Sequence, residues 1–306
     1  MLQWRIGAVT VSQIVESKGA SPPSFFFAAV EPADVQRHAW LRPHFAHRDG
    51  RLFASVHAFV IESEGRRIVV DTCVGNDKPR AIAMWNHLHG PFLDQMTAAG
   101  FAPESIDTVL CTHLHIDHVG WNTRLVDGRW RPTFPNARYL FGRIELAHWS
   151  ATHDADERQI LVDSVQPVID AGLADPVESD HVITSEVRLE PTPGHTPGHV
   201  SVRIRSEGSE AVITGDLMHH PIQCCEPDWS VHFDVDPQQA RATRRAFLER
   251  QADRPVLVLG THFAAPTGGW IMRDGAAWRF ATDESCLAGG VAGNGGSARR
   301  SARTSP

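Results

Sequence analysis

Short apolar runs separated by turn residues dominate the hydrophobic pattern of this chain. Residues 57–63 and 66–72 are two such runs, and the Glu64-Gly65 pair between them is typical of a hairpin turn. Residues 4–15 partly alternate between apolar and polar positions, which predicts an opening strand. Residues 106–112 are almost all apolar, as in a strand whose two faces are both buried within an α/β sheet. The first part of the chain is therefore predicted to form a sheet.

The second half continues this pattern, with helices between groups of strands. Further strands are predicted at residues 137–143, 187–192, 199–205, 210–216 and 255–261, and a last hairpin at 268–280. Leu161, Val165 and Val168 follow helical spacing, which predicts a helix over 157–172. The Asp236-Pro237 pair is a suitable start for a second helix over 237–251. This order fits two sheets covered by helices on the outside.

The pattern is consistent with one domain of residues 1–285. Within it, residues 19–52 are irregular and contain two prolines followed by three phenylalanines, which predicts an extended arm. The aromatic side chains either pack into the core or wall an apolar substrate pocket near the active site, and both alternatives remain open. The arm could also pack on a second subunit of a homodimer. Residues 286–306 are rich in Gly, Ser and Arg, which predicts a disordered tail.

The composition is that of a soluble globular protein. The chain has 306 residues, of which 42% are hydrophobic and 21% are charged. The net charge of −7 lacks the basic footprint of most nucleic-acid-binding proteins, so we expect no nucleic-acid partner. No apolar run approaches the roughly 18 residues of a membrane span, and the first residues do not resemble a signal peptide. Five cysteines without a CxxC pair fit reduced thiols, so we expect a cytoplasmic protein.

Histidine is the compositional feature that points to chemistry, because the chain contains 18 of them. The apolar strand at 106–112 runs directly into His113, His115, Asp117 and His118. A loop that turns after a buried strand can bring these side chains to one point. Imidazole nitrogens and carboxylate oxygens are ligands that borderline divalent cations prefer. Without a metal, such crowded polar groups would remain unsatisfied, so a metal site is predicted.

Three later strands end in the same way. His195 follows the strand at 187–192, Asp216 ends the apolar run at 210–216, and His262 follows the strand at 255–261. Ligands at several strand ends can meet at one sheet edge, where open α/β folds place their sites. The sequence therefore predicts a single metal centre assembled from four strand ends.

The motifs HxHxDH, GH, GD and GTHF, in this order, resemble those of the metallo-β-lactamase superfamily of binuclear metallohydrolases. The likeness extends over about residues 5–280. It implies an α/β fold, the four-layer αβ/βα sandwich of two mixed sheets flanked by helices. It further implies a first metal held by His113, His115 and His195, a second held by Asp117, His118 and His262, and Asp216 bridging both. The resemblance also implies that Asp71 orients one of the ligand histidines.

This resemblance implies a cofactor of two divalent metal ions, with zinc as the first choice and manganese, iron or cobalt as alternatives. Two such ions can share a hydroxide and lower its pKa toward neutrality, and the hydroxide would attack a carbonyl or phosphoryl centre. Asp117 would both ligate and steer the proton of the nucleophile. No serine or cysteine nucleophile is then needed, and we expect Cys224 and Cys225 to be buried small residues.

Within the superfamily, the local sequence is most similar to acyl-homoserine lactonases and methyl parathion hydrolases. The well-known lactonases carry a tyrosine three residues after the bridging aspartate, where this chain has His219. His219 either donates a hydrogen bond to a substrate oxygen, as a catalytic residue beside Asp117 and Asp216, or is an exposed loop histidine. We expect His199 to be structural and His220 to have no catalytic role.

The expected function is hydrolysis of a small-molecule lactone or carboxylic ester, with aryl phosphotriesters as further substrates. The alternatives are an organophosphate hydrolase, a thioester hydrolase similar to glyoxalase II, a nuclease of the same fold, and a non-enzymatic binding module. For the thioester alternative, Arg244, Arg245 and Arg250 on the helix at 237–251 would bind glutathione carboxylates. Otherwise these arginines form a solvated helix face.

Overall fold

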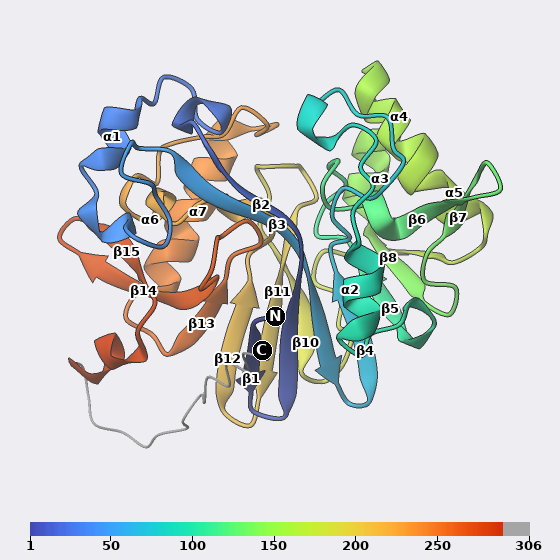
Figure 1. The fold of residues 1–306 in the computed structure, drawn as a ribbon. Coiled ribbons are helices and arrows are strands. Elements are labelled where there is room, and N and C mark those ends of the chain that lie inside the picture. The colour runs from blue at the N-terminus through green and yellow to red at the C-terminus, as the bar shows by residue number, and fades with distance from the viewer. Residues whose placement is uncertain (290–306) are drawn as a thin grey trace.

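Two β-sheets packed face to face form the centre of the molecule, and helices cover their outer faces (Figure 1). The computed structural model describes residues 1–289. Most of the predicted tail, residues 290–306, lies outside the described residues. The expected arrangement of two mixed sheets flanked by helices is confirmed. None of the helices within residues 1–289 is both long and apolar enough to cross a membrane.

The first sheet has seven strands, antiparallel at one side and parallel at the other. In spatial order these strands are β1 (Gln3–Ile6), β2 (Val9–Ser21), β3 (Leu52–Ser63), β4 (Arg66–Val70), β5 (Thr108–Leu110), β8 (Arg138–Gly142) and β9 (Ala174–Val177). The single opening strand predicted at 4–15 is in fact the β1–β2 hairpin. Gly7 makes this turn with a positive φ of 58°, and a Cβ there would lie 2.3 Å from the Ser206 carbonyl oxygen.

The second sheet has six strands and is also mixed, because only its β12–β13 pair is parallel. Its strands are β10 (Val187–Pro191), β11 (Val200–Ser206), β12 (Ser209–Ile213), β13 (Val256–Leu259), β14 (Gly268–Asp274) and β15 (Ala277–Ala281). A separate hairpin consists of β6 (Thr123–Val126) and β7 (Arg129–Pro132). The hairpin predicted around Asp274-Gly275 is confirmed.

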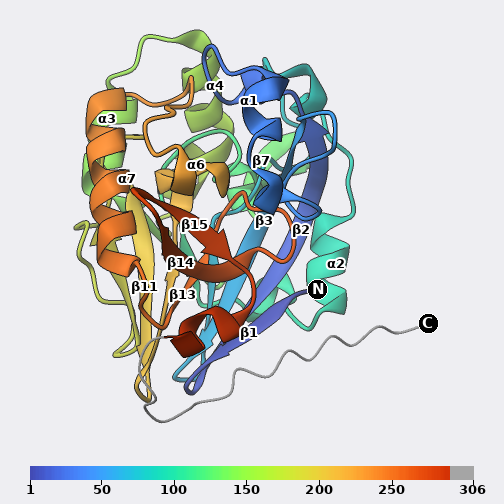
Figure 2. The ribbon, with the colours of Figure 1, turned by 90° about the vertical axis from the view of Figure 1, so that its left-hand side faces the viewer.

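Helices lie on both outer faces (Figures 1 and 2). The α-helices are α1 (Pro32–Gln36), α2 (Phe92–Ala98), α3 (Arg143–Ser150), α4 (Ala155–Ser164), α5 (Gln166–Asp170), α6 (Ile222–Cys225) and α7 (Pro237–Gln251). The 3-10 helices are η1 (Pro23–Phe25), η2 (Ala39–Leu41), η3 (Ala83–Trp85), η4 (Pro103–Ser105), η5 (Gly120–Asn122), η6 (Gly215–Leu217) and η7 (Glu284–Gly289). The first four residues of the predicted tail, 286–289, lie in η7.

Only one of the two predicted helices is confirmed as a single element. The Asp236 side chain accepts a hydrogen bond from the Gln239 N–H, and α7 has the predicted bounds. The helix predicted over 157–172 is wrong as a single element, because it divides into α4 and α5 at Val165. Pro167 has no N–H with which to continue the hydrogen bonds of α4, although it suits the first turn of α5.

Three apolar clusters hold these layers together. One lies between the sheets and includes Phe59 and Val70 from the first sheet and Val202 and Ile213 from the second. The other two fill the space between each sheet and its outer helices. This sandwich leaves the loops at the ends of the strands as the place where the two sheets can contribute polar residues to one site.

The N-terminal arm packs on the C-terminal half of the chain. The β2 strand extends to Ser21, so the irregular part of the predicted arm at 19–52 is shorter than expected. Phe26 and Phe27 are buried in the cluster of the second sheet, and Phe27 pairs with Val231. For these two residues the core alternative is correct. Phe25 is only partly buried and contacts Phe233, so for this residue both alternatives remain open.

Candidate metal centre

The predicted ligands lie in loops that follow strands of both sheets. The loop of residues 113–118 follows β5 in the first sheet. His195 lies between β10 and β11, Asp216 lies in η6 after β12, and His262 follows β13. Two sheets that are far apart in sequence therefore deliver side chains to one place, as the pattern of strand ends predicts.

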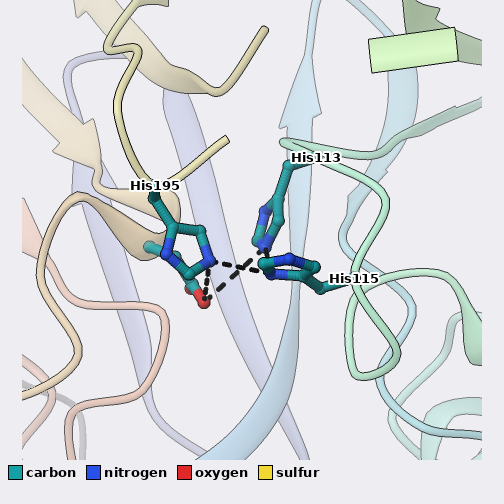
Figure 3. A group of neighbouring side chains, drawn as sticks. His113, His115 and His195 are labelled. Atoms are coloured by element: carbon teal, nitrogen blue, oxygen red, sulfur yellow. Dashed lines mark hydrogen bonds and ion pairs between the residues drawn. The ribbon is translucent and has the colours of Figure 1, made fainter. Parts of the chain in front are cut away.

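The first group consists of His113, His115, His195 and Asp216, whose ligand atoms all lie within 4.8 Å of one another. His115 Nδ1 lies 3.0 Å from His113 Nε2 and 2.8 Å from His195 Nε2. Figure 3 shows the three imidazoles turned toward one another, with His195 approaching from the opposite side to the loop that carries His113 and His115. Asp216 Oδ2 is 3.4 Å from His195 Nε2. The group has the composition predicted for the first metal plus its bridging carboxylate.

The second group consists of Asp117, His118 and His262. The Nε2 atoms of His118 and His262 are 3.3 Å apart, and each lies 3.6 Å from an oxygen of Asp117. Asp216 reaches this group as well, with Oδ2 3.3 Å from His118 Nε2 and Oδ1 3.1 Å from His262 Nε2. Asp216 thus lies between the two groups, where a bridging ligand must lie.

Hydrogen bonds alone cannot satisfy the first group. Burial holds the pKa values of His113, His115 and His195 well below the usual range, so these rings are neutral. The Nδ1 atoms of His113 and His195 face Thr112 Oγ1 and Asp234 Oδ1. These oxygens accept hydrogen bonds from Nδ1–H, so both Nε2 atoms present lone pairs. These lone pairs point at His115 Nδ1, which can carry at most one proton. The described residues therefore fit a shared cation, and together the two groups can hold two metal ions.

The carboxylates around the second group favour positive charge. Burial opposes protonation of His118 and His262, but the nearby carboxylates of Asp216 and Asp117, joined by Asp71 at His118, together outweigh burial and raise the pKa of each. The pKa of Asp216 is held well below its usual range, because the surrounding histidines overcome the cost of burying its charge. A divalent cation would replace the protons on these two histidines, so metal binding should release protons.

Two neighbouring residues, Asp71 and His199, contact the predicted ligands. Asp71 Oδ2 lies 3.0 Å from His118 Nδ1, and Asp71 also accepts the Thr112 N–H at 2.8 Å. His199 is buried, and its Nε2 accepts the N–H of Asp216 at 2.8 Å while its Nδ1 faces the Thr192 carbonyl oxygen. His199 therefore has a structural role and orients the backbone of Asp216.

His219 is not an exposed loop histidine, because only 3% of it is exposed. Its Nε2 lies 3.0 Å from Asp216 Oδ2, and its ring stacks on that of His262 with centroids 5.6 Å apart. Gln223 fixes its backbone by accepting the His219 N–H at 2.8 Å. His220 points elsewhere, with Nε2 2.8 Å from the Phe45 carbonyl oxygen. The structure thus brings His219, and not His220, to the centre.

Sequence reasoning missed two buried carboxylates beside the ligand loops. Asp234 Oδ1 lies 2.9 Å from His195 Nδ1. Glu145 on α3 accepts the N–H groups of Leu114 and Gly198, and so ties the two loops of the first group together. No motif marks either residue, because each acts on a loop that lies far away in the sequence.

Two other expectations need correction. Arg244 does not belong to a solvated face, because it is buried among backbone carbonyls. Of the two cysteines expected to be buried, Cys224 is buried, but Cys225 is partly exposed and contacts His38. The groups of potential metal ligands found within residues 1–289 contain neither cysteine.

The family model of the metallo-β-lactamase superfamily matches residues 52–262, which span every predicted ligand. The chain belongs to this superfamily. The match begins at β3 and ends at His262. Among curated proteins, this superfamily member is similar to an N-acyl homoserine lactonase from a Bacillus species, with 27% identity over 170 residues. The alignment covers 52% of this chain and spans about three fifths of that relative, 61% of its length.

Solved structures of similar proteins show the same fold. The hydrolase AbOPH of the beta-lactamase superfamily superposes with a TM-score of 0.76 and 22% identity, over 92% of this chain and 96% of that one. AidC, a dizinc quorum-quenching lactonase, gives a TM-score of 0.76 and 20% identity, over 92% of this chain and 97% of that one. At these identities the likeness establishes the sandwich fold of this superfamily member.

Metal retention should depend steeply on pH. Because the pKa values of His118 and His262 are raised, protons compete with metal at both residues as the pH falls. Release of two protons per metal corresponds to a loss of about a hundredfold in metal affinity per pH unit below both pKa values. Competition with a chelator at several pH values measures this slope. An affinity that stays constant from pH 8 to pH 5 would contradict the assignment of both histidines as ligands.

Proposed function

We propose that this protein is a binuclear metal-dependent hydrolase of lactones or carboxylic esters. The observation that carries the proposal is the convergence of two ligand groups with Asp216 between them. The N-acyl homoserine lactonase relatives support a lactone as the substrate class. The cofactor would be two divalent ions, with zinc as the first choice and manganese, iron or cobalt as alternatives.

Bound divalent ions would polarise the substrate carbonyl and make water nucleophilic near neutral pH. His113, His115 and His195 would hold one ion, Asp117, His118 and His262 the other, and Asp216 both. The proton of the attacking water needs an acceptor that reaches solvent. Asp117 is partly exposed whereas Asp216 is buried, so Asp117 can take up and pass on the proton of an attacking water.

His219 would replace the tyrosine of the lactonases. Its Nε2 faces Asp216 Oδ2, and this interaction weakens once a cation binds that oxygen. The Nε2–H would then be free to donate to the substrate's carbonyl oxygen, where negative charge develops. Its place against His262 puts this donor beside the second metal group.

An apolar patch next to this donor suits a substrate with a long hydrocarbon chain. Phe233 is 40% exposed and Val235 is 46% exposed, although large apolar side chains are usually covered. Phe233 contacts both His219 and Phe25 of the N-terminal arm. The Val235 N–H donates to the His195 carbonyl oxygen, so the patch borders the first metal group.

The arginines of α7 do not favour the thioester alternative. Arg244 is buried, Arg245 pairs with Asp228, and Arg250 pairs with Glu190. Each guanidinium that would bind the glutathione carboxylates already has partners. Phosphotriester hydrolysis remains the alternative function, and kinetic measurements must decide between it and lactone hydrolysis.

The substrate class is tested by kcat/KM of the metal-loaded protein on a long-chain acyl lactone, a short-chain acyl lactone and an aryl phosphotriester. We expect the long-chain lactone to reach about 10⁴ M⁻¹s⁻¹ or more, the low end for evolved enzymes. We expect the short-chain lactone and the phosphotriester to be far slower. A higher value for the phosphotriester would reverse the assignment, and values far below this on every substrate would contradict it.

The donor role of His219 is tested by a pair of variants that differ in one hydroxyl. His219→Tyr restores a donor at this position, whereas His219→Phe removes it. We expect His219→Phe to lower kcat about a hundredfold, as loss of one oxyanion donor does, and His219→Tyr to keep most of the activity. Equal activity of the two variants, at equal metal content, would show that no donor is needed there.

A further inference from the structure

Arg244 is a buried cation that the proposed chemistry does not use. It lies on α7, on the outer side of the second sheet (Figure 2), yet only 1% of it is exposed. Its Nε donates to the Leu217 carbonyl oxygen at 3.1 Å, and its Nη1 donates to those of Pro227 at 2.7 Å and Trp229 at 3.0 Å. Burying a guanidinium is costly unless hydrogen bonds and an opposite charge compensate it.

The opposite charge is Asp234, which connects Arg244 to the metal centre. Arg244 Nη2 lies 3.9 Å from Asp234 Oδ2, and the Val231 N–H donates to the same oxygen at 3.2 Å. The other oxygen, Oδ1, faces His195 Nδ1 at 2.9 Å. A carboxylate in this position holds the proton on Nδ1 and leaves the Nε2 lone pair facing the centre.

Arg244 also acts on the bridging ligand. Leu217, whose carbonyl it binds, directly follows Asp216 in η6. The loop that carries His195 rests on the same helix, because Thr243 donates to the Pro193 carbonyl oxygen at 2.7 Å. A Cβ on Gly194 would lie 2.3 Å from the Ala240 nitrogen, so this loop has no room to move toward α7.

We propose that Arg244 is a positioning residue for the first metal, because it fixes His195 through Asp234 and fixes Asp216 through the Leu217 carbonyl. This inference rests on the proposed two-metal function. The second metal group has a separate support, since Asp71, which directly follows β4, forms an ion pair with His118. Loss of Arg244 should therefore weaken the first metal more than the second.

The test is the metal affinity of Arg244→Met, which keeps an unbranched apolar stem and removes the charge and the donors of the guanidinium. We expect its first metal to bind about 10–100-fold more weakly, as when an outer partner of a ligand is lost. Arg244→Lys keeps the charge without the planar fork and should lose less. Arg245→Met is the matched control, because the Arg245 guanidinium is exposed and pairs with Asp228, away from the metal centre. Metal per chain is measured in buffered metal solutions, and the absorption spectrum of the cobalt-loaded protein reports the geometry of the site.

Asp234→Asn separates the route through Asp234 from a general effect on folding. We expect this variant to weaken the first metal as well, and the Asp234→Asn, Arg244→Met double variant to lose less than the sum of the two single losses. Strictly additive losses would overturn the route through Asp234. Wild-type affinity for both metals in Arg244→Met would overturn the proposal, as would wild-type affinity in Asp234→Asn if Arg244→Met does not fold.

This test is independent of the substrate. A wild-type chain that binds two metals but hydrolyses neither lactones nor esters would refute the proposed function. The dependence of the first metal on Arg244 would still be measurable in that chain.

Discussion

The arrangement of three neutral imidazoles around one buried point is the constraint on which the rest of this structure depends. Thr112 and Asp234 accept hydrogen bonds from the Nδ1–H groups of His113 and His195, so both rings turn their Nε2 lone pairs toward His115. Such an arrangement is unfavourable by itself and becomes favourable around a cation. Asp216 connects this group to the second one, because its Oδ2 faces His195 of the first group and its Oδ1 faces His262 of the second.

The sandwich provides this arrangement because two sheets end at the same place. The first sheet contributes the loop after β5 together with Asp71, and the second contributes the loops after β10, β12 and β13. Helices on opposite outer faces then hold the loops, with Glu145 of α3 on one side and Arg244 of α7 on the other. Helices outside the two sheets thus support the loops that carry the candidate ligands.

The predicted elements and ligands were those with a local signal. Asp236 and Pro237 define the start of α7, and the closely spaced histidines after β5 indicate a metal site by themselves. Pro167 is also a local signal, but the helical spacing of apolar residues at 157–172 continues across it. The prediction from that spacing therefore merged two helices into one. Asp234 and Arg244 could not be predicted in the same way. Their partners are fixed only when α7 packs against the second sheet, and an arginine on a charged helix usually faces water.

The central claim is that these two residue groups bind two metal ions with Asp216 between them. Anomalous diffraction from crystals of the purified chain, recorded at the absorption edge of the metal found by elemental analysis, tests it most directly. The account predicts two peaks, one among His113, His115 and His195 and one among Asp117, His118 and His262. A single peak, or two peaks away from Asp216, would contradict it.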